Sequence, residues 1–558
     1  MLHLLKGTSK LLTNYQFALS AGFWRGVMIR CSVLLILSFG LSVFSATEER
    51  INQFLPKFES YIQKNLPVWA IPGMAVVVIT KDKVLLCKGF GTREVGKIKP
   101  VNKHTVFQIA SLTKNFTASL AGILEKKKFF SLYDLAKTHL PKFILSNSDI
   151  TNKVTLADLM GHRVGFESFS GDTLMKAGYS PEEIMDKFHL IPIEQRFRED
   201  YSYSNQMFGF MGLVIESATQ KKYAELVNEY IYTPLEMKDS SAGATLIEQE
   251  NSLWNKIKKI FGCDANIALC HDKNLEGNAV CIGLDPLIYV YPSTSGINTS
   301  AHDLGIWLQC QLNNGKLNGV EIIPEDHIQA MRQPVAKHTK VKPRDLQFPP
   351  ELMRNISYGM GWFVYDYGPS ENSIQVLEHH GGYSGQRSTM FMCPAQGFAV
   401  GILSNLGHFN VNLFPEALRN FFISSFLGLE ERDWSAEYAE RKNTYLKKIH
   451  SQRANKKLLK PTPKRDDNSY LGVYKNDLYG EMRIEKDSKG LLLKIKDRSC
   501  HIVHWNGDEF SINGWEFNGN MSRSDPHFIE FGVNEKGQML AYVSFLHEGN
   551  DPIFVKNQ

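Results

Sequence analysis

Residues 107–117 read Phe107-Gln108-Ile109-Ala110-Ser111-Leu112-Thr113-Lys114-Asn115-Phe116-Thr117. An apolar approach ends at Ser111, and a new pattern then places an apolar residue at every third or fourth position: Leu112, Phe116, Leu120, Ile123 and Leu124. Such spacing predicts a helix with one apolar face that runs to about Lys127. Ser111 stands at its start, where a serine hydroxyl commonly caps an unpaired amide of the first turn.

Lys114 gives Ser111 a second interpretation. Residues three apart share one face of a helix, so the two side chains are expected to meet. A serine hydroxyl is a poor nucleophile until a base removes its proton. An amine that is shielded from water has a lowered pKa and can be that base. The pair therefore predicts nucleophilic catalysis if other catalytic elements accompany it.

A second polar element is Tyr203-Ser204-Asn205, which precedes a helical pattern that begins near Phe208. Serine and asparagine often cap helices, which is the simpler interpretation. Beside Ser111, a tyrosine can relay protons and an asparagine amide can hold a substrate oxygen. The triplet alone is weak, because Tyr474-Lys475-Asn476 repeats it in another region.

The third element is His379-His380-Gly381-Gly382. The glycines allow a backbone to approach a ligand closely, and a main-chain amide there can bind an oxyanion. Two adjacent histidines also suggest a metal, but no third ligand follows at a fitting spacing, and neither a zinc-ribbon spacing nor His-Glu-x-x-His occurs. We therefore predict no metal and no cofactor. His162 is expected to be structural, with backbone partners.

In this order, the three elements resemble the serine β-lactamase and penicillin-binding protein superfamily, above all its class C-related branch of esterases, D-amino-acid peptidases and LACTB-type hydrolases. The resemblance covers roughly residues 50–425. Four further phrases support it: Leu159-Met160-Gly161-His162-Arg163-Val164-Gly165, Pro292-Ser293-Thr294-Ser295-Gly296-Ile297, Ser300-Ala301-His302-Asp303 and Tyr358-Gly359-Met360-Gly361-Trp362.

The resemblance implies a role for each element. Ser111 would be the acylated nucleophile, Lys114 and Tyr203 the proton-handling pair, and Asn205 a substrate contact. The amides of Ser111 and Gly382 would form the oxyanion hole. His379, Gly381 and Gly382 would line the substrate site.

One position departs from the antibiotic-hydrolysing members. His379 stands where they usually place a lysine, whose fixed charge serves a substrate carboxylate, and a histidine is largely neutral near pH 7. We therefore expect ester or peptide substrates rather than efficient β-lactam hydrolysis. His380 is bulkier than the usual residue and is expected to narrow the site.

Composition sets the wider frame. The 558 residues are 43% hydrophobic with a net charge of +5, which predicts a globular chain of several domains and no nucleic-acid partner. Residues 1–45 resemble a signal peptide, because the uncharged run Cys31–Phe44 follows Arg25 and Arg30, and Met28 is an alternative start of translation. We expect a secreted or periplasmic protein, or alternatively one held on a membrane by this segment as an uncleaved anchor.

Residues 49–429 are predicted to form the hydrolase domain, an α/β fold with an antiparallel sheet flanked by helices and an all-helical lobe. The expected elements are a helix at 49–65, a hairpin of 73–80 and 84–91, and a buried strand at 398–403. Residues 240–288 are atypical. Cys263, Cys270 and Cys281 there would permit a disulfide in an oxidising compartment, and residues 254–261 suggest a surface helix or a flap over the pocket.

Residues 430–467 are rich in lysine and arginine, which predicts a solvated linker helix, with contact to a membrane surface or an anionic polymer as the alternative. Residues 468–558 resemble a lipocalin-like β domain, with strands expected at 480–484, 491–495, 528–531 and 540–545. The whole sequence predicts a serine hydrolase for a small-molecule or peptidoglycan-peptide substrate. The alternatives are an acylated binding or sensing module and a catalytically idle relative.

Overall fold

The computed structural model describes residues 46–260, 264–274, 276–335, 351–407, 412–457, 462–512, 527–544, 546 and 552–557. The predicted signal peptide and Cys263 lie outside these residues. Among the helices that are described, none has the length and apolar character needed to cross a membrane. A helix covers residues 46–65, as the apolar stripe at 49–65 predicts.

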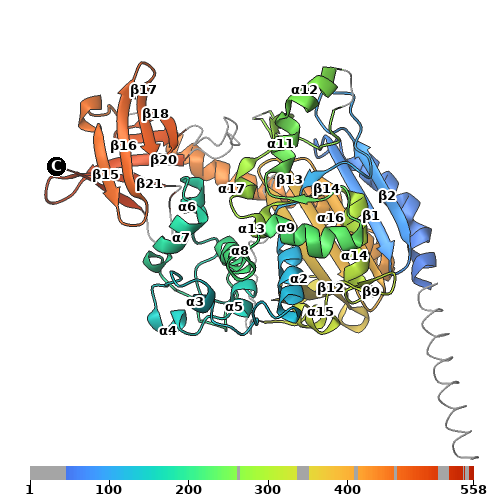
Figure 1. Cartoon of the computed structure of the whole chain (residues 1–558). Helices are drawn as coiled ribbons and strands as arrows, with labels where there is room; N and C mark the ends of the chain where they lie inside the picture. Colours follow the sequence, from blue (N-terminus) through green and yellow to red (C-terminus); the bar gives the residue numbers. More distant parts are fainter. Residues whose placement is uncertain are drawn as a thin grey trace, which may run out of the picture. The chain divides into compact units, whose positions relative to one another are not determined.

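A seven-stranded antiparallel sheet forms the centre of the hydrolase region, in the order β10-β11-β12-β13-β14-β1-β2. Strands from both ends of this region meet in it, so blue β1 and β2 lie beside orange β13 and β14 (Figure 1). The predicted hairpin and buried strand are confirmed as β1, β2 and β14. The bounds are β1 Gly73–Thr80, β2 Val84–Gly91, β10 Met353–Tyr358, β11 Phe363–Tyr367, β12 Ile374–Tyr383, β13 Gln386–Cys393 and β14 Phe398–Ser404.

Helices cover both faces of this sheet. α14 (Ala301–Leu312) packs on β1 and β14, and α16 (Phe414–Leu427) packs on β13 and β14. The remaining helices of the region include α2 and those of the helical lobe: α2 Thr113–Lys126, α3 Ala136–His139, α4 Ser148–Thr151, α5 Leu156–Met160, α6 Asp172–Lys176, α7 Pro181–Lys187, α8 Asn205–Thr219, α9 Tyr223–Val227, α10 Thr233–Leu235, α13 Pro292–Ser295 and α15 Glu325–Met331. The predicted α/β architecture is confirmed.

Ser111 does not cap the helix that follows it. It lies in a 3₁₀ turn, η1 (Ala110–Leu112), and the N-cap of α2 is Leu112, which provides no side-chain hydrogen bond. The capping interpretation of Ser111 is therefore wrong. By contrast, Ser204 caps α8, because its side chain accepts a hydrogen bond from the Met207 amide. The serine hydroxyl at 111 is thus available to other partners.

Residues 240–288 form small elements around a three-stranded sheet of β3 (Phe107–Gln108), β7 (Ile297–Thr299) and β4 (Ser241–Ala242). The others are α11 Thr245–Asn251, α12 Leu253–Ile260, β5 Cys270–Lys273, β6 Ala279–Gly283 and η4 Pro286–Tyr289. Cys270 and Cys281 are free thiols, so the permitted disulfide does not join these two. α12 leaves Leu253 74% and Trp254 66% exposed, as a surface helix does.

The predicted linker helix is α17, Trp434–Lys457. One face of its first turns is buried rather than solvated, which corrects the prediction: Trp434, Ser435 and Tyr438 are buried. The Tyr438 hydroxyl accepts hydrogen bonds from Arg419 and Asn420 of α16 at 3.1 and 3.2 Å. The aromatic residues one helical turn apart pack onto the hydrolase core, whereas the basic residues dominate the composition.

The C-terminal strands close into an antiparallel barrel, which confirms the lipocalin-like prediction. Its strands alternate buried and less buried positions, as in Leu491, Leu493 and Ile495 of β17, because successive side chains point to opposite faces. The bounds are β15 Gly472–Asn476, β16 Gly480–Asp487, β17 Gly490–Ile495, β18 Arg498–Asn506, β19 Glu509–Ile512, β20 His527–Val533, β21 Met539–Val543 and β22 Ile553–Lys556.

Candidate active site

Ser111 and Lys114 meet as their spacing predicts. Ser111 is half-buried at the head of α2, while Lys114, one turn further on, is completely buried. The Lys114 Nζ lies 2.9 Å from Ser111 Oγ, 2.8 Å from Asn205 Oδ1 and 3.2 Å from the Thr294 carbonyl oxygen. These three oxygens come from three separate segments, so the fold itself assembles the surroundings of the amine.

Burial changes the chemistry of Lys114. Removal from water penalises the ammonium form and lowers the pKa of Lys114 to about 7, although the negative charge of Asp172 opposes this shift. A neutral amine at this position can donate its two hydrogens to Asn205 and Thr294, whose oxygens are pure acceptors. Its lone pair then faces the Ser111 hydroxyl. Near neutral pH the amine is therefore able to accept the serine proton.

Tyr203 lies beside the same pair. Burial raises the pKa of its phenol, and a hydrogen bond with Ser111 offsets only part of that rise. Its ring centroid is 4.9 Å from the Lys114 Nζ. Because the phenol keeps its proton at neutral pH, Tyr203 is suited to pass a proton along a hydrogen bond rather than to act as a phenolate base.

Asp172 is a site residue that sequence reasoning missed. Its Oδ2 accepts a 2.7 Å hydrogen bond from Asn205 Nδ2, and its Oδ1 accepts one from Gln206 Nε2 at 3.2 Å. The Asn205 amide is thereby oriented, with its nitrogen on Asp172 and its oxygen on Lys114. Asp172 belongs to no motif, and its place in the first turn of α6 offers no signal in the sequence beyond an ordinary acidic residue near a helix start.

The residue before the nucleophile has a strained backbone. Ala110 has φ of 46°, in the left-handed region that side chains other than glycine disfavour. The Ile109 amide holds this turn by donating to the Ile297 carbonyl at 3.1 Å. Such strain is common where a chain must turn sharply to present a catalytic side chain.

His379 lies on the face of β12 that Lys114 approaches, and it is 1% exposed. Its Nδ1 is 2.8 Å from the His380 carbonyl, which can only accept, so Nδ1 carries the proton. The Tyr358 hydroxyl then donates to Nε2 over 3.1 Å. Burial, followed by the charge of Lys114, lowers the pKa of His379 to about 3. The ring is neutral, and both of its nitrogens are engaged within the protein.

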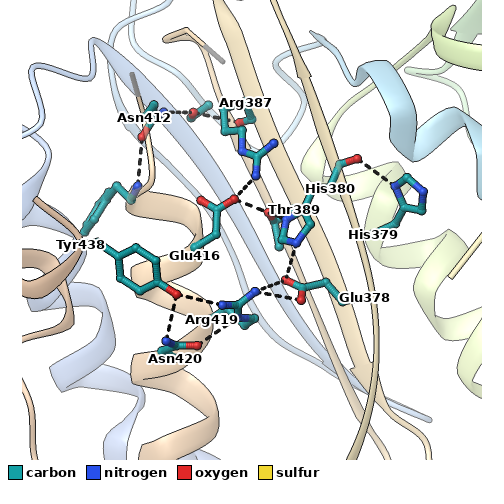
Figure 2. A network of polar contacts seen from close by, with 12 residues as sticks. Glu378, His379, His380, Arg387, Thr389, Asn412, Glu416, Arg419, Asn420 and Tyr438 are labelled. Carbon is teal, nitrogen blue, oxygen red and sulfur yellow. Dashed lines mark hydrogen bonds and ion pairs between the residues drawn. The ribbon is translucent and has the colours of Figure 1, made fainter. Parts of the chain in front are cut away.

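His380 points to the opposite face of the same strand (Figure 2). Its Nδ1 is 3.0 Å from Thr389 Oγ1 and 3.4 Å from a Glu416 oxygen, and its Nε2 is 3.5 Å from Glu378. The expectation that His380 narrows the site is therefore wrong. Alternation along a strand sends neighbouring side chains to opposite faces, so only one of the two histidines can face Lys114.

The two glycines bring the backbone of β12 against the nucleophile turn. A Cβ on Gly381 would lie 2.0 Å from the Ile109 carbonyl oxygen. β12 and β13 are joined by only two residues, so their closing pair Tyr383–Gln386 is hydrogen-bonded, and alternation turns the Gly382 N–H away from β13. β12 also contacts η1, the segment that carries Ser111. The strand that carries Gly381 and Gly382 therefore lies against the nucleophile turn.

His162 is buried, as a structural histidine is, and one of its two ring nitrogens has the backbone partner that the sequence predicts. It is completely buried, and its Nδ1 accepts a 3.1 Å hydrogen bond from the Ser204 amide. Its ring packs 4.5 Å from the ring of Tyr203. His162 therefore supports the Tyr203–Asn205 segment from behind.

Residues 63–422 match the sequence family described as Beta-lactamase. The chain belongs to this family. Residues 457–546 match a second family, described as a domain of unknown function, DUF3471. The Beta-lactamase match includes every catalytic and substrate-binding residue predicted from the sequence, from Ser111 to Gly382.

Individual relatives share little sequence identity with this chain. Protein flp of Staphylococcus aureus (strain MW2) is 22% identical over 358 residues, which are 64% of this chain and 64% of flp. The chain therefore spans just under two thirds of that relative. Unguisins hydrolase ungD of Aspergillus violaceofuscus is 22% identical over 458 residues, or 77% of this chain and 76% of ungD.

A solved structure shares the fold. The octameric penicillin-binding protein homologue from Pyrococcus abyssi matches with a TM-score of 0.56 and 19% identity, over 90% of this chain and all of the other. At this identity the likeness concerns the fold alone. It agrees with the sheet and helical lobe described above.

Proposed function

We propose that this protein is a serine hydrolase that forms an acyl-enzyme on Ser111. The observation that carries the proposal is the 2.9 Å contact between Ser111 Oγ and a completely buried Lys114 whose pKa is about 7. Membership of the Beta-lactamase family supports serine hydrolase activity in general terms.

Acylation follows from these groups. Neutral Lys114 takes the Ser111 proton as Oγ attacks the substrate carbonyl, and the new C–O bond leaves a tetrahedral oxyanion. The amides of Ser111 and Gly382 stabilise that oxyanion. As the intermediate collapses, the proton passes from Lys114 through the Tyr203 hydroxyl to the leaving group, whose bond to the acyl carbon breaks.

Deacylation returns the enzyme to its first state. A water molecule attacks the acyl carbon and gives its proton to Lys114 or Tyr203, and the Ser111 oxygen leaves with a proton from the same pair. Asn205, held by Asp172, keeps its oxygen on Lys114 throughout. In this scheme Asp172 is a positioning residue rather than a catalytic one.

The charges around the nucleophile favour particular substrates. His379 is neutral and engaged through both nitrogens, so it offers no cation for a carboxylate beside the scissile bond. Asp172 adds an acidic group next to Asn205. We therefore propose esters, or D-amino-acid amides and esters that carry an amine, in preference to lactams that carry a carboxylate.

Covalent labelling tests the nucleophile. Intact-mass spectrometry of the wild type after incubation with a fluorophosphonate should show one adduct, and Ser111→Ala should show none. An unlabelled wild type, or an adduct that persists in Ser111→Ala, contradicts the assignment and favours the idle or binding alternatives. With a penicillin, a stable Ser111 adduct would favour the sensing module.

A substrate panel tests the class. The values of kcat/KM should be higher for p-nitrophenyl esters and D-alanine p-nitroanilide than for nitrocefin, which carries a carboxylate. His379→Lys should shift the ratio toward nitrocefin, because it restores a cation. Faster hydrolysis of nitrocefin than of the esters by the wild type would contradict the proposed preference.

A further inference from the structure

Three side chains outside the candidate active site come together at one end of the small sheet. His104, Asp239 and His302 each present a ligand atom, and these atoms all lie within 4.8 Å of one another. The rings of His104 and His302 are 4.8 Å apart, and His104 Nδ1 is 2.8 Å from Asp239 Oδ2.

The topology of the sheet explains the meeting. His104 precedes β3, Asp239 precedes β4, and His302 follows β7. Because both outer strands run antiparallel to β7, their starting ends lie beside its final end, as the pair Phe107–Thr299 shows. Three segments that are distant in the sequence therefore converge. No spacing motif links these three residues, so the sequence alone does not reveal the group.

The cluster has the supporting bonds of a metal site. His302 Nδ1 is 2.9 Å from Asp303 Oδ1, which leaves His302 Nε2 for a ligand. Asp303 is 1% exposed and is fixed by hydrogen bonds from the Asp239 amide and the Ser240 hydroxyl. A carboxylate behind a histidine fixes its tautomer and strengthens it as a ligand.

Asp239 is held as well, because its Oδ2 accepts a 2.8 Å hydrogen bond from the Ser300 hydroxyl. The group remains open to solvent, with side-chain exposures of 47% for His104, 25% for Asp239 and 40% for His302. An ion therefore has a route to all three.

We propose that His104, Asp239 and His302 bind a divalent transition-metal ion, with Zn²⁺ as the best fit. Two imidazoles and one carboxylate are ligands that zinc accepts, and a water would complete a tetrahedron. Ligand atoms about 3.4 Å apart surround a tetrahedral zinc at about 2.1 Å, so modest side-chain rotation closes the present 4.8 Å spread.

The ion would clamp the three segments that frame β3. β3 leads directly into Ile109, Ala110 and Ser111, so the site fixes the far end of the strand that ends at the nucleophile turn. A structural role of this kind predicts stabilisation of the folded chain by zinc rather than participation in the reaction.

Binding of the metal alone to the full chain tests the proposal. Titration calorimetry with ZnCl₂ should give one strong site in the wild type. His302→Ala and His104→Ala should each lower the affinity about tenfold or more, and Asp303→Asn, which keeps the shape, should lower it about 10- to 100-fold. His501→Ala is the matched control, because His501 also bonds a carboxylate, that of Asp487, at 2.8 Å but belongs to no group of three candidate ligands among the described residues.

Cobalt provides a measurement that needs no variant. Co²⁺ bound by the wild type should give the intense visible absorption of a tetrahedral site with nitrogen ligands, and excess Zn²⁺ should remove it. The melting temperature should rise with Zn²⁺ in the wild type and in His501→Ala but not in His302→Ala. Equal zinc affinity in the wild type and both histidine variants, or a cobalt spectrum like that of the free ion, would overturn the proposal.

Discussion

Two neighbouring histidines on β12 have opposite surroundings. His379 faces Lys114 and packs among Tyr358 and Phe363, with neutral partners on both ring nitrogens. His380, one residue later, faces a buried layer of carboxylates and guanidinium groups between the sheet and α16 (Figure 2). The strand thus separates a reactive side from a supporting side.

The supporting side is held by fully buried charges. Arg419 Nη1 donates to both oxygens of Glu378 at 2.8 Å, and the Tyr365 hydroxyl donates to Glu378 at 2.7 Å. Arg387 pairs with Glu416, and all four charged residues are at most 3% exposed. Burying an ion pair costs much desolvation energy, so such a pair adds little net stability and is tolerated only where the two groups are well aligned. We infer that this layer fixes the position of β12, whose other side faces Lys114.

The largest expected effect is on the reactive side. Lys114→Gln should lower the rate of fluorophosphonate labelling by about 10²- to 10⁴-fold, because it removes the base. In the wild type that rate should fall about tenfold per pH unit below about pH 7, where Lys114 becomes an ammonium. Lys126→Gln, an exposed position on the same helix, is the control. A flat profile through pH 7 would contradict Lys114 as the base.

The next effect is on the supporting side. Arg387→Met leaves the Glu416 carboxylate buried without its partner and should lower the free energy of unfolding by about 3–5 kcal/mol. Urea unfolding of the purified variant measures this. The double variant Arg387→Met/Glu416→Leu removes both charges and should recover most of the loss. A single variant as stable as the wild type would show that the pair does not constrain β12.

His379 gives a pH-dependent effect of intermediate size. An unfolded histidine binds a proton near pH 6.5, but the folded His379 does so only near pH 3. The unfolded state therefore holds more protons, stability is fully present above pH 6.5, and it falls by about 1.4 kcal/mol per pH unit as the pH drops toward 3. His379→Phe should reduce the slope of the unfolding free energy against pH by the contribution of one proton, which is about 1.4 kcal/mol per pH unit. His189→Ala, a change on the surface, should leave this slope unchanged. Equal slopes would contradict the neutral buried ring.

The smallest effect concerns Asp172. Its negative charge raises the pKa of Lys114, so Asp172→Asn should move the pH profile of labelling to lower pH, by about one unit or less. Asp186→Asn, in the adjoining helix α7, is the control. A loss of rate without any shift of the profile would indicate that Asp172 only orients Asn205.

The comparison also shows what the sequence can predict. Local sequence patterns were sufficient to predict β1, β2 and β14 and the Ser111–Lys114 contact, because each of these depends on residues close together in the chain. Asp172 and the Arg419–Glu378 pair had no such signal, since their roles arise from contacts across 33 and 41 positions. Thr294 lies in a phrase that supports the family resemblance, but its contact with Lys114 spans 180 positions and has no local pattern. Composition misled at α17, where seven lysine and arginine residues concealed the buried Trp434 and Tyr438.

The two Tyr-x-Asn triplets make the same point. Tyr203-Ser204-Asn205 reaches Lys114, whereas Asn476 of the barrel accepts hydrogen bonds from the amides of Leu478 and Tyr479 in a turn. The two triplets share the Tyr-x-Asn pattern, but their side chains have different neighbours. The triplet at 203–205 was identified as a site element by its position along the chain relative to the two other elements.

The close approach at Gly381 has a consequence for how this protein can diversify. A single added carbon there would meet the Ile109 carbonyl at 2.0 Å, so backbone rather than side chains sets the distance between β12 and the nucleophile turn. We therefore expect changes of substrate specificity to come from the loops and helices near Ser111 rather than from this contact. A side chain at position 381 would therefore have to push β12 away from the nucleophile turn. We expect every variant that keeps the present distance between β12 and this turn to retain glycine at position 381.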